Sequence, residues 1–357
     1  QEIHELMYGR AARPDEDQAL FVYPFYTVYL MVPFALIPDY HMARAIWMTV
    51  LEISLVALML ISLSLSRWKI PTWTLVFLVI FSVFWYHSFR PLINGNPVVL
   101  VALMIALAFM AIRAEHDGLA GFLLAFATIK PQIVVLLAVY VLFWSMTQRR
   151  WRLFWGFISS LIILIVTSFM FVPNWLIENL RQIIAYPGYT LPGTHREILM
   201  DALPGVGNQL GWALTIVMMT AMIVEWRASA HKGFTWFYWT ALLTLVATTM
   251  VGIPTTTENY LALLPALVLV FSAWDTHWRT MGKWLVALSM AMLFFGLWWL
   301  FLATLQPGDQ PVQSPIMFFP LPLFLFVTLY WVRWWVLRPT KPLLEQLRRI
   351  QKTSTYK

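Results

Sequence analysis

Residues 42–66 read MARAIWMTVLEISLVALMLISLSLS, and this stretch alone is long enough to cross a bilayer as one helix. The hydrocarbon core of a membrane requires about 20 mostly apolar residues in helical conformation. Further apolar stretches recur as far as Leu337, and short charged loops separate them. The 357 residues are 60% hydrophobic and 11% charged, which is not the composition of a soluble domain. The sequence therefore predicts an all-α, polytopic helical membrane protein.

Nine spans are predicted from apolar runs that are bounded by charges, proline or glycine. They cover residues 42–66, 71–87, 96–112, 152–172, 208–225, 234–252, 257–273, 284–304 and 315–337. Two other apolar regions do not fit a simple span. Residues 24–37 are short and broken by prolines, which favours an interfacial or re-entrant helix. Residues 118–146 read as two short helices hinged at Lys130-Pro131, because proline disfavours helical conformation in the residue before it.

The expected organisation has three parts. An outer-face segment (1–23) precedes a transmembrane domain (24–337), which carries one long outer loop (173–207) and is followed by a basic tail (338–357). Nothing before Phe21 resembles a signal peptide or a first span, so we expect the sequence to be N-terminally incomplete. We find no internal repeat of the kind that duplicated transporters carry.

Lys and Arg are concentrated in alternate loops and in the tail. The basic loops contain Arg67 and Lys69, then Arg113, then Arg149, Arg150 and Arg152, then Arg227 and Lys232, then Arg279 and Lys283. The positive-inside rule places these loops and the C-terminus in the cytoplasm of a cell-membrane protein. This assignment requires residues 118–146 to enter and leave from the cytoplasmic side, or to cross twice. The Lys130-Pro131 tip would then lie deep in the membrane or near its outer face.

Composition and motifs exclude several classes of function. No cysteine is present, so neither disulfides nor thiolate chemistry is available. The net charge of +7 follows from membrane orientation and does not indicate a nucleic-acid partner. Zinc-ligand spacing, a phosphate loop, a dinucleotide fingerprint and a serine elbow are all missing from the sequence. We therefore expect no metal site and no cofactor.

Lys130 is the first candidate for a functional residue. An unpaired lysine at bilayer depth costs a few kcal/mol, so such residues usually have a partner or a function. The functional interpretation is a ligand for a lipid-linked phosphate, and the alternative is a lysine that extends to the membrane interface.

The predicted outer face holds the remaining candidates. Possible phosphate ligands are the turn Asn94, Gly95 and Asn96, which can open a helix N-terminus to an anion, the nearby His87 and Arg90, and His195 and Arg196 of the outer loop. Glu258 is a possible general base, although a carboxylate in a first helical turn can equally be a cap. Asp15 and Asp17 belong to an acidic run that usually means a solvated loop.

Several of these stretches together resemble glycosyltransferase family 87, of the GT-C superfamily. They are Tyr23-Pro24 with Pro33 and Leu36-Ile37-Pro38, then Ala43 to Trp47, Asn94 to Leu100 with a helix to Arg113, Gly118 to Ala125, Ile129-Lys130-Pro131, and Arg149 to Arg152. The resemblance covers residues 20–155, and Phe25 departs from the second proline of the family's Tyr-Pro-Pro segment.

The resemblance implies an integral-membrane glycosyltransferase. Such an enzyme transfers a hexose, mannose in this family, from a polyprenyl-phosphate sugar to a lipid or glycan acceptor at the outer face, and membrane lipids surround it. A catalytic Asp is expected in the first outer loop, just after the first span. This chain has no clear counterpart to it, so either that Asp belongs to the missing N-terminal part, or Asp15, Asp17 or Glu258 supplies the catalytic carboxylate. Two alternatives stay open: a non-catalytic subunit of a larger membrane complex, and a lipid or solute transporter.

Overall fold

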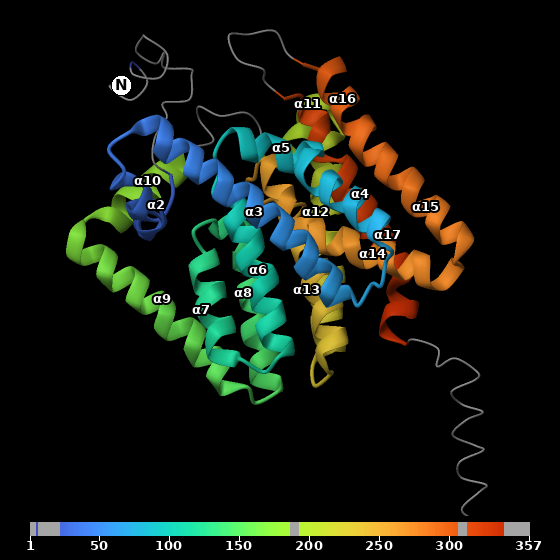
Figure 1. Cartoon of the computed structure of the whole chain (residues 1–357), viewed down its shortest axis with the longest axis horizontal. Helices are drawn as coiled ribbons and strands as arrows, with labels where there is room; N and C mark the ends of the chain where they lie inside the picture. The colour runs from blue at the N-terminus through green and yellow to red at the C-terminus, as the bar shows by residue number, and fades with distance from the viewer. Residues whose placement is uncertain (1–4, 6–21, 186–192, 306–312, 339–357) are drawn as a thin grey trace, which may run out of the picture.

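The computed structural model describes residue 5 and residues 22–185, 193–305 and 313–338, and all regular structure in these ranges is helical (Figure 1). Six helices there are long and apolar enough to cross a membrane. They are Tyr40–Ser66 (α3), Trp151–Phe171 (α9), Gly207–Ser229 (α12), Thr257–Trp278 (η3, Thr257–Leu263, with α14, Leu264–Trp278), Thr280–Ala303 (α15 to α16) and Pro315–Leu337 (η5 with α17, Pro320–Leu337). All six coincide with predicted spans, which confirms a polytopic helical membrane protein.

The other three predicted spans are helical but shorter or bent. Thr72–Phe84 (α4) and Tyr86–Ile93 (α5) meet at a bend of 51°. Val98–Arg113 (α6) has 16 residues and Phe234–Thr248 (α13) has 15. The turn at Gly95, with φ of 61°, separates α5 from α6. Gly252, with φ of 88°, and the proline two residues later keep α13 from extending through the predicted span.

The hinge at Lys130-Pro131 is confirmed. Asp117–Ala127 (α7) and Pro131–Thr147 (α8) are separate short helices, and Lys130 between them has the non-helical angles φ −115° and ψ 79°. The segment 24–37 forms a short helix, Phe25–Thr27 (η1) followed by Val28–Ala35 (α2). The predicted outer loop, residues 173–207, contains two more short helices, Trp175–Ala185 (α10) and His195–Ala202 (α11).

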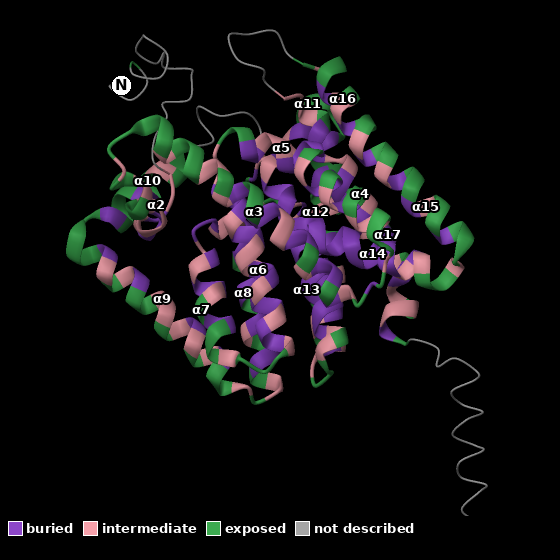
Figure 2. Ribbon diagram, in the orientation of Figure 1, coloured by how far each residue is buried: buried purple, intermediate pink, exposed green. Residues whose placement is uncertain are grey.

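The helices differ strongly in how much of their surface the protein covers (Figure 2). In the most apolar window of each helix, 72% of Thr257–Trp278 is buried, against 22% of α9 and of α12. The helix η3–α14 is therefore the centre of the bundle, while α9 and α12 expose apolar side chains at its edge. Apolar side chains on a membrane protein's outer surface face lipid, so their exposure is the expected state.

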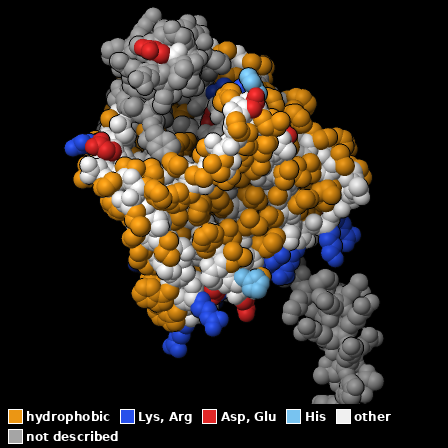
Figure 3. All heavy atoms as spheres, turned by 60° about the vertical axis from the view of Figure 1, so that its left-hand side comes forward, with side chains coloured by type: hydrophobic (Ala, Val, Ile, Leu, Met, Phe, Trp, Pro, Cys, Tyr) orange, Lys and Arg blue, Asp and Glu red, His pale blue; other side chains and the backbone are white. Residues whose placement is uncertain are grey.

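Loops predicted for the same side of the membrane contact one another. At one end, Arg113 donates to the carbonyl of Ser64, and Trp144 Nε1 donates to the carbonyl of Lys232. At the other end, the backbone N–H of Thr255 donates to the carbonyl of Gly193. Figure 3 shows hydrophobic side chains covering most of one face, with Lys and Arg gathered mainly toward its lower end. This separation is the pattern that the positive-inside rule describes.

Candidate functional site

Glu258 lies in the first turn of η3 and is held by the turn before α6. Asn94 Nδ2 donates to Glu258 Oε1 and Asn96 Nδ2 donates to Glu258 Oε2, both at 2.6 Å. Asn96 Oδ1 also accepts the backbone N–H of Val98, the first residue of α6. The two amides occupy one lone pair on each carboxylate oxygen, which fixes the carboxylate but leaves each oxygen able to accept another proton donor.

The 94–96 turn is itself anchored. Trp47 Nε1 of α3 donates to the carbonyl of Gly95 at 2.9 Å. A Cβ at position 95 would lie 3.2 Å from the same indole nitrogen, and the φ of 61° strains any other residue. Glycine therefore allows the turn to approach Trp47 and to present both asparagines to Glu258.

Lys130 lies beside Glu258, on the hinge between α7 and α8. Its side chain is buried, with 3% exposed, and its Nζ donates to Asn259 Oδ1 at 3.0 Å. Asn259 in turn donates to Thr255 Oγ1 at 3.0 Å, and the ring of Tyr23 lies 5.3 Å from Nζ. The ammonium is thus enclosed by protein and hydrogen-bonded to a neighbouring helix.

His87 and Arg90 lie on α5, and His87 contacts the residue before Glu258. The Nδ1–H of His87 donates to the carbonyl of Thr257 at 2.8 Å, and the His87 ring is fully buried against Tyr260. The Arg90 guanidinium lies 5.2 Å from the ring centroid of Phe301. Among the described residues, His87 Nε2 and Arg90 Nε are buried without a hydrogen-bond partner. Through its hydrogen bond to Thr257, His87 contacts the first residue of η3.

The predicted outer loop reaches the cluster through its backbone, whereas its candidate side chains have other partners. The carbonyl of Gly193 accepts from Thr255, but the Nε2–H of His195 donates to the carbonyl of Phe318 at 2.9 Å. Arg196 donates to Asn208 Oδ1 at 3.2 Å and lies over the ring of Trp212. Burial lowers the pKa of His195 to about 4, against the opposing effect of its backbone hydrogen bonds. The structure thus does not bring His195 or Arg196 toward Lys130.

Sequence reasoning missed Asn259, Thr255 and Trp47 as parts of this cluster. Asn259 stands in the polar run from Thr255 to Tyr260, between Pro254 and an apolar helix, which was the one available signal. Asp15 and Asp17 lie outside the described residues. Among the residues that the structure does describe, no group of three His, Cys, Asp or Glu side chains could hold a metal ion.

This arrangement has the chemistry of a site for an anionic, hydroxyl-bearing substrate. A carboxylate with free lone pairs can accept a hydroxyl proton, and a buried ammonium can stabilise negative charge in a weakly screened environment. The asparagine amides supply further donors and acceptors around them.

The sequence model of glycosyltransferase family 87 matches residues 21–257. The match includes Trp47, the 94–96 turn and Lys130, and it stops one residue before Glu258. No curated protein matches the chain, and no solved structure does either.

Proposed function

The chain belongs to glycosyltransferase family 87, and from that premise we propose that it is an integral-membrane enzyme acting on a polyprenyl-phosphate sugar. It transfers a hexose, with mannose as the proposed sugar, to a lipid or glycan acceptor at the outer face of a cell membrane. The observation that carries the proposal is the polar cluster of Glu258, Lys130, Asn259 and the 94–96 turn. Glu258 and Asn259 belong to the first turn of the central helix, and Lys130 and the 94–96 turn meet them from two other parts of the chain.

Lys130 is the proposed ligand of the donor phosphate. Its ammonium uses one of three N–H donors on Asn259, so two remain for phosphate oxygens. Negative charge increases on the phosphate as the bond to the sugar breaks. A fixed ammonium in a site of low dielectric stabilises that charge without reorganising. Asn94 and Asn96 belong to the same proposed donor site, and His87 and Arg90 lie on its border.

Glu258 is the proposed general base. In an inverting transfer, the acceptor hydroxyl gives its proton to a carboxylate while its oxygen attacks the anomeric carbon, and the polyprenyl phosphate leaves. The Asn94 and Asn96 amides hold both oxygens of Glu258 in place, so the carboxylate need not be ordered when the acceptor binds. Asp15 and Asp17 remain the alternative bases.

The proposal is tested with the full-length protein in liposomes, supplied with polyprenyl-phosphate hexoses and a membrane lipid extract as acceptor. We expect transfer of labelled hexose to an extractable product. Glu258→Gln should lower the rate by about 10²- to 10⁴-fold while donor binding is kept, since general-base catalysis is worth about that factor. Glu197→Gln is the matched control, because Glu197 is an outer-loop carboxylate that caps α11.

Each outcome separates the candidates. Transfer that survives in Glu258→Gln assigns the base elsewhere, and Asp15→Asn and Asp17→Asn are then measured in the same way. A protein that transfers none of the hexoses offered contradicts the enzyme proposal and favours a non-catalytic subunit.

A further inference from the structure

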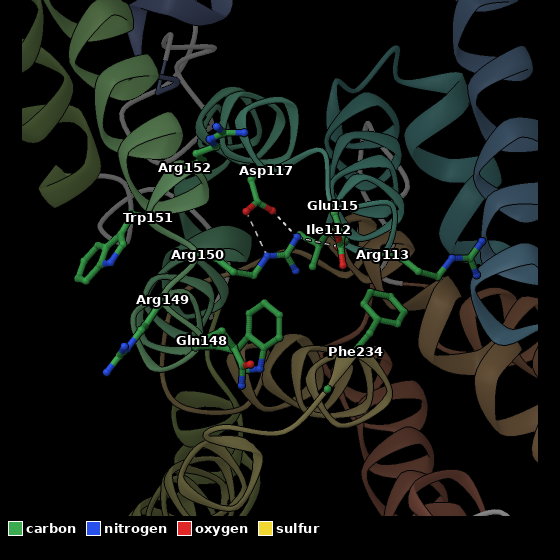
Figure 4. Close-up of a pocket in the computed structure, with 12 residues that line it drawn as sticks. Ile112, Arg113, Glu115, Asp117, Gln148, Arg149, Arg150, Trp151, Arg152 and Phe234 are labelled. Carbon is green, nitrogen blue, oxygen red and sulfur yellow. Dashed lines mark hydrogen bonds and ion pairs between the residues drawn. The ribbon is translucent and has the colours of Figure 1, made fainter.

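A cavity of about 700 Å³ lies at the end of α6 that is distant from the polar cluster (Figure 4). The Asn96 turn begins α6 and Arg113 ends it, so about 24 Å of helix separates the two places. The cavity is lined by the ends of α6 and α8 and by the beginnings of α7, α9 and α13. Its volume is in the range of small-molecule sites, about 300–1,000 Å³.

The lining has an excess of positive charge. Four arginines face two carboxylates, Glu115 and Asp117. Arg150 crosses the middle of the cavity, where its Nε donates to Asp117 at 3.2 Å and its Nη2 donates to the carbonyl of Ile112 at 2.9 Å (Figure 4). Arg150 and Asp117 neutralise each other, so Glu115 and the other three arginines determine the net charge that a ligand meets.

Two arginines on the rim have no protein partner. Within the described part of the chain, the side chains of Arg149 and Arg152 make neither a hydrogen bond nor an ion pair, and both residues are exposed. Arg113 points away from the centre toward α3 and donates twice to Ser64, and Arg149 also extends away from the centre, on the opposite side (Figure 4). The two unpaired guanidinium groups are therefore available to an anion that approaches the opening.

Apolar side chains lead away from the same opening. One exposed stripe along α8 consists of Val135, Val139, Phe143 and Met146. The helix ends just before Gln148 and Arg149, which line the cavity. On α9, Trp151 and Trp155 are exposed beside Arg152. A ligand with a charged head at the arginines would thus have an apolar surface beside it for a tail.

We propose that this cavity binds the headgroup of an anionic phospholipid from the cytoplasmic leaflet. The positive-inside rule places the 113–117, 148–152 and 233–234 segments on that side. The leaflet carries a negative surface potential, and each Lys or Arg near it adds about 1 kcal/mol to the attraction. The exposed stripe on α8 favours a lipid over a free phosphate compound, because a free phosphate makes no use of it.

The test measures binding of short-chain phosphatidylglycerol to the full-length protein in a neutral detergent. Phosphatidylcholine of the same chain length and glycerol phosphate are the comparison ligands. We expect the anionic lipid to bind at least tenfold more tightly than either of them. The double variant Arg149→Gln/Arg152→Gln should weaken its binding by about 25-fold, the equivalent of two such charges.

The matched control is Arg227→Gln/Lys283→Gln, which removes two exposed cations from the end of α12 and the first turn of α15, on the same predicted side. It should leave the affinity within about threefold, and the thermal unfolding of both double variants should match the parent protein. If the control variant lost as much affinity for the lipid, the loss would be a consequence of the net charge of the surface, and the proposal would be overturned. Glycerol phosphate binding as tightly as the lipid would overturn it too, since the tail would then contribute nothing.

Discussion

At the scale of single residues, the two charged side chains of the candidate site are held by asparagine side chains. Lys130 and Glu258 lie at helix ends, where backbone turns bring asparagine amides within hydrogen-bonding distance. A charged group removed from water costs several kcal/mol unless it is paired or hydrogen-bonded. The asparagines therefore offset part of the cost of placing these two charges within the bundle, and they also orient the charged groups.

Lys130→Ala is expected to lower the transfer rate about 30- to 1000-fold, because about 2–4 kcal/mol of charge stabilisation at the leaving phosphate is lost. Lys130→Arg should restore only part of the rate, since a planar guanidinium does not replace a compact ammonium. Turnover is measured in detergent or liposomes beside thermal unfolding. A folded alanine variant with a near-normal rate would show that Lys130 has a structural role alone.

His195 should make stability depend on pH. Its pKa is about 4 in the folded protein and 6.5 when unfolded, so the unfolded state binds more protons between these values. The free energy of unfolding should be highest above pH 6.5 and fall by about 3 kcal/mol as the pH drops to 4. His195→Gln, which can still donate to Phe318, should lose this part of the slope. Thermal unfolding of both proteins from pH 7.5 to 4 measures the difference.

At the scale of helices, α7 and α9 pack unusually closely. A Cβ on Gly121 would lie 2.4 Å from the backbone N of Phe157, and a Cβ on Gly156 would lie 3.3 Å from Gly118 Cα. Small residues that let helix backbones approach are the usual device for packing in membranes, where hydrophobic burial gives no drive for association. This contact holds α9 against the bundle although most of its surface is exposed.

Gly121→Ala should therefore destabilise the protein by about 1–3 kcal/mol, because the two backbones must separate. The control is Gly118→Ala, three residues earlier on α7, where an added Cβ meets nothing within 4 Å. That variant should be neutral or up to about 1 kcal/mol more stable, through helix propensity alone. Equal thermal shifts in the two variants would mean that the contact between α7 and α9 does not matter for stability.

At the scale of the whole molecule, one ion pair joins helices that are far apart in the sequence. Arg333 of α17 donates through Nε and Nη2 to the two oxygens of Glu225 on α12, both at 3.0 Å. Trp236 and Trp239 of α13 lie beneath the same guanidinium, each at 5.4 Å. Glu225 is buried, so the pair determines how three helices assemble at this end of the bundle.

Arg333→Met should destabilise the protein by about 3–5 kcal/mol, because it leaves the buried Glu225 carboxylate without a partner. Glu225→Leu combined with Arg333→Met should recover most of that loss, since apolar pairs can replace buried ion pairs. The measurement is thermal unfolding of the two variants in the same detergent. A double variant as unstable as the single one would show that the pair's geometry, and not the unpaired charge, accounts for the cost.

Much of the architecture was accessible from local sequence patterns. Apolar length located the six long helices, Pro131 located the break between α7 and α8, and alternating basic loops sorted the turns into two groups. The bounds of α6 were predicted to within two residues, whereas the length of α13 was not accessible, since apolar residues continue past its C-terminal end. The turn at Gly252 and Pro254 follows α13, and the hydropathy pattern did not show that the helix ends before this turn.

The sequence by itself determined the membrane class, the positions of the helices and the candidacy of Lys130 and Glu258. These properties depend on local composition, because crossing a bilayer constrains each segment separately. Only the tertiary structure decided which candidates meet. It joined Glu258 to Asn94 and Asn96 across more than 160 residues, joined Lys130 to Asn259, and turned His195 and Arg196 to other partners. Hydrogen bonds of this kind depend on distances and angles between helix ends, and one-dimensional spacing does not contain that information.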